Sequence, residues 1–110
     1  MVKLSELSCK ACKIDATKLS EQDINEQIAQ LPEWSIVEED NINKLRKEFK
    51  FKNFVEALNF TNKVGALAEK HGHHPDILTE WGKVTVTWWS HKIKGLHQLD
   101  FILALKTSKL

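Results

Sequence analysis

The chain has 110 residues, 42% of them hydrophobic and 28% charged, which is the composition of an ordinary globular domain. Sixteen basic and fifteen acidic side chains leave a formal net charge of +1, so no electrostatic signal indicates a nucleic acid or an anionic membrane as the partner. No apolar run approaches the roughly 20 residues that span a bilayer, and the first residues lack the apolar core of an export signal. We expect a single cytoplasmic domain over residues 1–110.

The amino-terminal segment, residues 1–19, shows no clear periodicity and is expected to be irregular. It contains Cys9 and Cys12, which form a single C-x-x-C motif. A structural zinc site normally has four ligands, and the sequence holds no second pair of cysteines to complete one. We therefore interpret both cysteines as reduced thiols.

The next part of the chain predicts a short helix followed by a hairpin. Ser20 is expected to cap a helix that closes at Pro32. After Trp34, apolar and polar residues alternate on both sides of a polar turn at 39–41, which indicates two antiparallel strands. In the second strand we expect the face that includes Phe49 to meet the core. The opposite, charged face is expected to meet water, and it consists of Lys44, Arg46, Glu48 and Lys50.

A long helix, two further strands and a closing helix are predicted for the rest of the chain. Asn53, with Glu56 three positions later, marks the start of the long helix, and Gly72 marks its end. A strand beginning at 77–78, a tight turn at 81–82, a β-branched strand over 83–89 and a helix over 96–105 follow. The buried face of the long helix is predicted to contain Phe54, Ala57, Leu58, Thr61, Val64, Gly65 and Ala68, and Phe60 and Leu67 are expected to widen it.

These elements have the order α-β-β-α-β-β-α. Strands that pair as hairpins, with helices available to cover one face, indicate an α+β fold built on a four-stranded antiparallel sheet with the helices packed on one face. The edge strands of such a sheet are open to pairing with a second copy, so we expect the chain to self-associate.

A histidine cluster lies between the long helix and the third strand. His71, His73 and His74 fall within four residues, and Gly72 and Pro75 mark the segment as a turn. If the long helix and the last strand are neighbours, His73 and His74 meet His91, which follows that strand, around one pocket. Imidazoles on opposite walls suit a reaction that removes one proton and gives another to a leaving group, such as the elimination of water.

Other residues near the cluster have supporting parts in this hypothesis. Glu69 is placed to hold one imidazole in a defined tautomer. Pro75 restricts the backbone of His74 to an extended conformation. Trp81 or Trp89 is placed to form a flat wall for a planar ring.

The spacing alone leaves two alternatives open. The histidines can belong to a structural loop, with Trp81 filling the corner of a hairpin. They can also supply nitrogen ligands to a metal ion, but neighbouring side chains in an extended turn point to opposite sides, so we expect no metal. His71 and His97 have the weakest claim to the site and are expected to face solvent.

The spacing that runs from Glu69 through the His73-His74-Pro75 triplet, Trp81 and His91 to Asp100 resembles the signature of the pterin-4a-carbinolamine dehydratase family. Residues 49–54 and the Gly95-Leu96 pair are similar to that family too, and the resemblance extends over residues 34–104. His97 departs from it, because serine or threonine is common there, and residues 88–90 are bulkier than is usual. The positions that carry the resemblance are Glu69, His73, His74, Pro75, Trp81, His91 and Asp100.

The resemblance implies dehydration of 4a-hydroxytetrahydrobiopterin to quinonoid dihydrobiopterin, which recycles the cofactor of aromatic amino acid hydroxylases. It implies a homodimer or homotetramer that uses neither a metal nor an organic cofactor. Catalysis is then expected from His73, His74 and His91, and which of them is the acid stays open. Glu69 and Asp100 are the expected supporting and orienting carboxylates, and Trp81 and Pro75 are expected to contact the substrate.

A binding module is the alternative function. Some animal members of the family bind a homeodomain transcription factor and stabilise its dimer, and a resemblance in fold does not exclude such a role. The sequence contains neither a basic face nor a partner motif that favours it.

Overall fold

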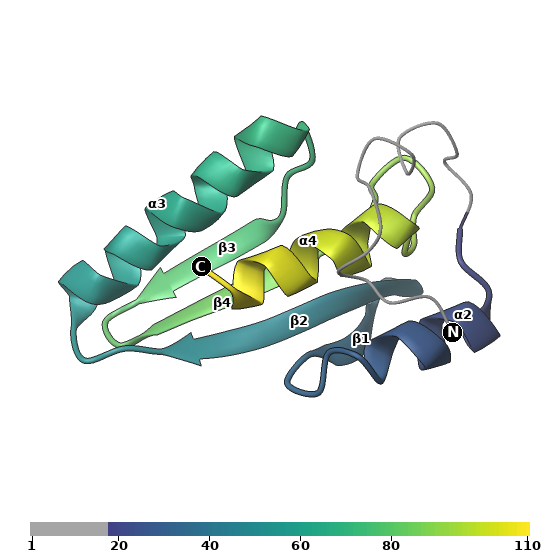
Figure 1. Cartoon of the computed structure of the whole chain (residues 1–110), viewed down its shortest axis with the longest axis horizontal. Helices are drawn as coiled ribbons and strands as arrows, with labels where there is room; N and C mark the ends of the chain where they lie inside the picture. Colours follow the sequence, from purple (N-terminus) through teal and green to yellow (C-terminus); the bar gives the residue numbers. More distant parts are fainter. Residues whose placement is uncertain (1–17) are drawn as a thin grey trace.

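The computed structural model describes residues 18–110, so the predictions for Cys9 and Cys12 lie outside the described residues. Figure 1 shows the elements in chain order. They are α2 (Glu21–Ile28), β1 (Ser35–Glu39), β2 (Ile42–Lys50), α3 (Phe54–His71), β3 (Asp76–Glu80), β4 (Lys83–Trp88) and α4 (Gln98–Ser108). This order confirms the predicted α-β-β-α-β-β-α pattern. Within the described range, no helix is both long and apolar enough to cross a membrane.

The four strands form one antiparallel sheet in the order β1-β2-β4-β3, and the helices pack on one face of it (Figure 1). The β1–β2 hairpin closes through Asp40 and Asn41, whose φ angles of 54° and 63° are both positive. Positive φ at both central residues is the geometry of the hairpin turn that matches the twist of its strands. The antiparallel sheet with helices on one face confirms the predicted α+β class.

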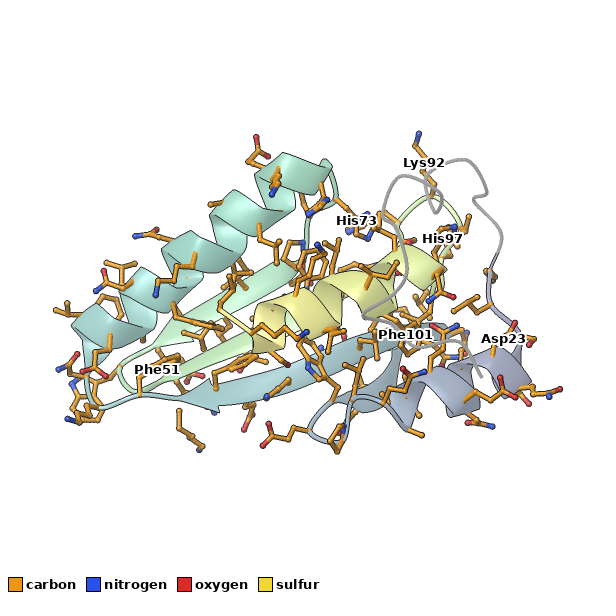
Figure 2. All side chains as sticks on the ribbon, viewed as in Figure 1. Asp23, Phe51, His73, Lys92, His97 and Phe101 are labelled. Atoms are coloured by element: carbon orange, nitrogen blue, oxygen red, sulfur yellow. The ribbon has the colours of Figure 1, made fainter. Side chains whose placement is uncertain are left out.

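Capping residues define both ends of α3, the helix that leads to the histidine cluster. The Asn53 side chain accepts a hydrogen bond from the backbone N–H of Glu56 at 2.9 Å. At the other end Gly72 adopts φ 61° and ψ 30°, a left-handed conformation that glycine takes at little cost. Figure 2 shows Phe51 at the end of the molecule where α3 begins and His73 at the end where it stops.

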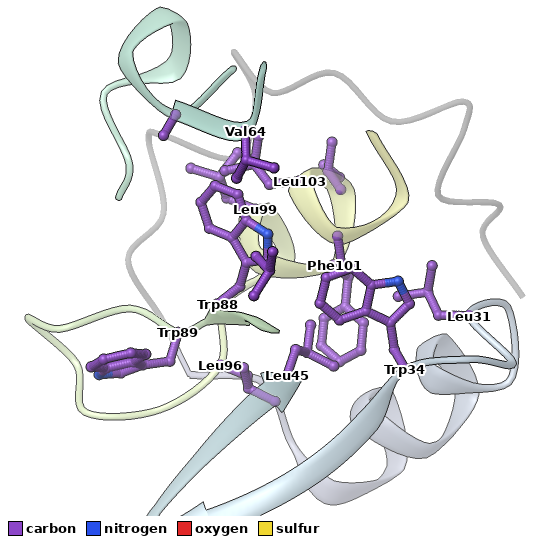
Figure 3. Close-up of a cluster of buried hydrophobic side chains, with 14 of the residues drawn as sticks. Leu31, Trp34, Leu45, Val64, Trp88, Trp89, Leu96, Leu99, Phe101 and Leu103 are labelled. Atoms are coloured by element: carbon purple, nitrogen blue, oxygen red, sulfur yellow. The ribbon is translucent and has the colours of Figure 1, made fainter. Parts of the chain in front are cut away.

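The core lies between the sheet and the helices. Leu45 pairs with Trp88 across β2 and β4, and both side chains have no exposed surface. The Trp88 indole N–H donates to the hydroxyl of Thr107 in α4 at 3.1 Å, so this buried donor is satisfied. Burying one large apolar side chain contributes about 1.5–3 kcal/mol relative to leaving it exposed. Figure 3 shows this cluster, whose members include Leu31, Trp34, Leu45, Val64, Trp88, Leu96, Phe101 and Leu103.

The buried face of α3 differs from the predicted one. Phe54 and Leu58, which were expected to be buried, are 45% and 43% exposed. Phe60, which was expected only to widen the buried face, lies at its centre, and its ring is 4.6 Å from that of Phe49 and 5.1 Å from that of Phe51. Because Phe60 fits against these two rings, the helix is rotated about its axis and turns Phe54 and Leu58 outward. The buried residues of α3 are Ala57, Phe60, Val64 and Ala68.

The charged face of β2 also differs from the expectation at one position. Lys44 was predicted to meet water, yet its side chain is only 10% exposed. The ring of Trp89 covers it, with the lysine Nζ 4.1 Å from the ring centroid. A bulky residue that folds back over the open face of the sheet is thus the reason for the difference.

Candidate active site

A pocket of about 690 Å³ lies at the end of the molecule where α3 and β4 finish. All five histidines of the sequence line it. The structure thus brings His73 and His74, at the exit of α3, to the same cavity as His91, which follows β4. The lining residues are His71, Gly72, His73, His74, Ser90, His91, Lys92, Ile93, His97 and Leu99.

His73 is held by a buried carboxylate. Its Nε2 atom lies 2.6 Å from Oδ1 of Asp100, and the Asp100 side chain has no exposed surface. Because an ionised carboxylate only accepts hydrogen bonds, the proton of a neutral His73 ring is expected on Nε2. The other oxygen of Asp100 accepts from the Ser90 hydroxyl at 2.7 Å and from the His97 backbone N–H at 2.9 Å. Asp100 therefore contacts His73, Ser90 and the backbone of His97 at the same time.

His74 contacts a different carboxylate. Its Nε2 atom forms a short hydrogen bond with Oε2 of Glu69, which lies in the last turn of α3. The side chains are 62% and 78% exposed, so water screens this pair far more than the His73–Asp100 pair. The neighbouring imidazoles of His73 and His74 thus diverge toward different partners, as expected for an extended turn.

Two adjacent tryptophans each lie against one histidine of the pocket. The rings of His73 and Trp88 are almost parallel, at 8°, with centroids 5.8 Å apart. The rings of His91 and Trp89 stack at 4.2 Å with an angle of 26°. Trp88, the last residue of β4, reaches the core, whereas Trp89, the next residue, packs on Lys44 of β2. The two tryptophans consequently support the pocket from different sides.

His97 was expected to face solvent, which is wrong, and His71, for which we expected the same, is half-buried. His97 is only 8% exposed and is the N-cap of α4, where its Nδ1 accepts from the backbone N–H of Leu99 at 3.0 Å. Asp100 returns a hydrogen bond to the His97 backbone, which completes a capping box. The spacing His97-x-x-Asp100 at the start of a helix was the signal that could have located this cap. The Nε2 atom of His71 is buried as well.

Trp81 does not lie at the pocket within a single chain. It occupies the β3–β4 turn and is 70% exposed. Strand β3 starts just after His74 and runs to the opposite end of the sheet (Figure 1), so Trp81 lies about 16 Å from the start of the strand at about 3.3 Å per residue. Pro75 is not a lining residue either, and it joins His74 to β3. The expectation that Trp81 forms a wall of this cavity is corrected accordingly.

The fold and the pocket together define a small α+β domain that gathers imidazoles around an open cavity, with two of them bonded to carboxylates. Such an arrangement suits proton transfer. Over residues 18–110, no group of three His, Cys, Asp or Glu side chains has an arrangement that would hold a metal ion.

Residues 17–110 match the family model described as pterin 4 alpha carbinolamine dehydratase. The chain therefore belongs to the pterin-4-alpha-carbinolamine dehydratase family, whose members are hydro-lyases, and the resemblance seen in the sequence is confirmed. A curated protein of Nitrosococcus oceani, provisionally named pterin-4-alpha-carbinolamine dehydratase, is 60% identical over 110 residues, which cover 100% of this chain and 97% of that protein.

Two solved structures share the fold. One is a transcriptional coactivator/pterin dehydratase from Brucella melitensis, with a TM-score of 0.77 and 32% identity over 84% of this chain and 97% of that one. The other is a pterin dehydratase-like protein described as a RuBisCO assembly factor in the alpha-carboxysome. It has a TM-score of 0.56 and 22% identity over 68% of this chain and 87% of that one, so the likeness concerns the fold alone.

Proposed function

We propose that the chain dehydrates 4a-hydroxytetrahydrobiopterin to quinonoid dihydrobiopterin in the cytoplasm, by histidine general acid–base catalysis. The reaction would recycle the pterin cofactor of aromatic amino acid hydroxylases. The observation that carries the proposal is the convergence of His73, His74 and His91 on one pocket, in a chain that belongs to this family.

The chemistry requires two proton transfers on neighbouring atoms. The bond between C4a and the hydroxyl oxygen breaks, and a proton from a general acid lets that oxygen leave as water. A general base takes the proton of N5, so that a double bond forms between N5 and C4a. Each positioned acid or base typically contributes about 10²–10⁴-fold to the rate. Imidazole suits both roles because its pKa lies near neutral pH.

The contacts of His73 support it as the group whose charge changes. Its Nε2 proton is directed at Asp100, which leaves Nδ1 as the ring atom with a lone pair. A proton accepted at Nδ1 would create an imidazolium that the buried carboxylate of Asp100 stabilises directly. The contact between His74 and Glu69 is more exposed and offers weaker support of the same kind.

The test is the rate of 4a-hydroxytetrahydrobiopterin dehydration by the wild type and by His73→Ala, His74→Ala and His91→Ala. We expect each variant to remain folded. At least two of the three variants, one for the acid and one for the base, should lose about 10²–10⁴-fold in kcat. Lys94→Ala is the control, because Lys94 belongs to the same loop as His91 but does not line the pocket. A wild type no faster than buffer would refute the proposal.

A dimerisation or transcription-cofactor module is the second candidate function. It is favoured by the name of the Brucella melitensis structure, which joins a coactivator role to a dehydratase role in one protein. A pull-down from cell extract distinguishes the two. Recovery of pterin-dependent hydroxylases supports recycling, whereas recovery of a regulator, equally with wild type and with His73→Ala, supports the binding module.

We further propose that the chain forms a homodimer or homotetramer. Strands β1 and β3 are the edges of the sheet, and an edge strand offers unpaired backbone groups to a second copy. Large apolar side chains are exposed on and near β3, and they are Phe54, Val55, Leu58, Leu78 and Trp81. Sedimentation at low micromolar concentration that shows only a monomer would contradict this proposal.

A further inference from the structure

The three histidines that approach each other in the pocket are held in different ways. His73 and His74 each bond to a carboxylate. Among residues 18–110, no hydrogen bond or ion pair orients the ring of His91, which is exposed and stacks on Trp89 with centroids 4.2 Å apart. The orientation of His91 therefore depends on a ring contact from the open face of the sheet.

We propose that Trp89 is the positioning residue for His91, and that Lys44 in turn holds the Trp89 ring in place. This inference rests on the proposed function, because the group that it positions is one of the proposed acid–base histidines. It assigns a task to the bulky residue at 89 and to a lysine outside the pocket.

The surroundings of Trp89 support its part. The residue is only 9% exposed although it follows β4 on the face that no helix covers. Figure 3 shows Trp89 set apart from Trp88 and from the rest of the buried cluster. A ring that is buried on an otherwise open face offers a fixed surface, and a stacked imidazole on that surface loses rotational freedom before the substrate arrives.

Lys44 is itself fixed by a small network on the same face. Its Nζ lies 4.1 Å from the Trp89 ring centroid and 3.2 Å from Oε1 of Glu39. The same Glu39 oxygen accepts from Arg46 at 2.9 Å, and Arg46 also donates to the hydroxyl of Thr87 at 2.9 Å. A lysine that is paired on one side is well placed to pack on an aromatic face on the other. The chain of contacts runs from Glu39 through Lys44 and Trp89 to His91.

Catalysis is sensitive to such positioning. A displacement of about 1 Å in a reacting group can cost about 10²-fold in rate. A leucine at position 89 would keep the apolar character and remove the flat surface, whereas a phenylalanine would keep a smaller flat surface. The two variants therefore separate the ring contact from simple burial.

The first experiment measures kcat, KM and the proton NMR signals of the His91 ring in the wild type, Trp89→Leu and Trp89→Phe. Those signals are assigned by their loss in His91→Ala. We expect an upfield displacement of the His91 signals in the wild type, because the ring lies over an indole. Trp89→Leu should abolish that displacement and lower kcat about tenfold or more, with a smaller change in KM. Trp89→Phe should retain most of the displacement and most of the wild-type kcat. A folded Trp89→Leu with the signals and kcat of the wild type would overturn the proposal.

The second experiment uses a matched pair of lysines, which keeps the proposal testable if Trp89→Leu does not fold. Lys47 makes contacts of the same two kinds, because its Nζ lies 4.5 Å from the Phe49 ring centroid and 2.7 Å from Glu33, but it neither packs on Trp89 nor lines the pocket. Lys44→Met should shift the His91 signals and lower kcat a few-fold, whereas Lys47→Met should change neither. Equal behaviour of the two variants would overturn the part assigned to Lys44.

These readouts also separate the inference from the proposed function. An inactive wild type whose His91 signals are displaced upfield, and lose that displacement in Trp89→Leu, would refute the dehydratase activity and keep the positioning. An active wild type whose His91 signals are not displaced would support the dehydratase activity and refute the positioning of His91 by Trp89.

Discussion

Asp100 and His73 are joined by a hydrogen bond of 2.6 Å, although they belong to α4 and to the exit of α3. The same carboxylate accepts from Ser90, beyond the end of β4, and from the backbone of His97, at the start of α4. One buried side chain thus links three segments that form the pocket. The geometry of His73 is consequently coupled to the cap of α4 and not to the turn at 72–75 alone.

Replacing Asp100 by asparagine tests this coupling. The amide has one acceptor oxygen and one donor NH₂, but three donors converge on Asp100, so at least one donor faces the NH₂ group. We expect His73 to move its proton from Nε2 to Nδ1, and kcat to fall about 10²-fold or more. Steady-state kinetics of purified Asp100→Asn measures the loss. Asp76→Asn, an exposed aspartate at the start of β3, is the matched control and should keep the wild-type kcat.

The capping role of His97 leads to a prediction about stability. Loss of an N-cap typically costs about 1 kcal/mol of unfolding free energy. His97→Ala should lose about that amount, whereas His97→Ser should lose much less, because a serine hydroxyl can accept the same backbone hydrogen bond. Urea denaturation of the two variants provides the comparison. If both variants lost the same amount, the cap would not be what His97 contributes.

Local signals in the sequence account for most of the fold. The caps Asn53 and Gly72 define α3, and Asp40 and Asn41 close the first hairpin as their residue types predict. The rotation of α3 about its axis was not predictable in this way, because it depends on how Phe60 meets Phe49 and Phe51 from another element. The helical period of α3 is compatible with more than one buried face, and only tertiary packing selects one.

Prediction of the site, like that of the fold, succeeded where nearby residues decide the structure and failed where contacts between distant segments decide it. The turn at 72–75 and the exit of β4 were located from the sequence, so the meeting of His73 and His91 followed from one assumption about neighbouring elements. Trp81 was misplaced because closeness in sequence to His74 hides the direction of β3, which leads away from the pocket. The burial of Lys44 was missed because strand alternation says nothing about Trp89, a residue outside that strand.

The network around Lys44 should make stability depend on pH. Hydrogen bonds from Arg46 and Lys44 hold the pKa of Glu39 below its ordinary value of 4.5. Because the folded-state pKa is lower than the unfolded one, the stabilisation is present above the unfolded pKa and is lost as pH falls through the folded pKa. Glu39→Gln should therefore be less stable than the wild type at pH 7, and the difference should shrink below about pH 4.5. Urea denaturation of both proteins across this range measures it, and a constant difference would contradict the account.

The indole of Trp88 leads to the last prediction. Its buried N–H donates to Thr107, whose side chain has no exposed surface. Thr107→Val keeps the shape but leaves that donor without a partner, which typically costs about 1–3 kcal/mol of unfolding free energy. Trp34 offers a matched comparison, because its indole N–H donates at 2.7 Å to Ser108, an exposed residue.

Water can replace the hydroxyl of Ser108 but not that of Thr107, so Ser108→Ala should cost less than Thr107→Val in the same denaturation assay. Because Trp88 also lies parallel to His73, we expect Thr107→Val to lower kcat as well, whereas Ser108→Ala should not. Equal losses of stability in the two variants would mean that water reaches the Trp88 indole, and that the core above the pocket is more open than its burial indicates.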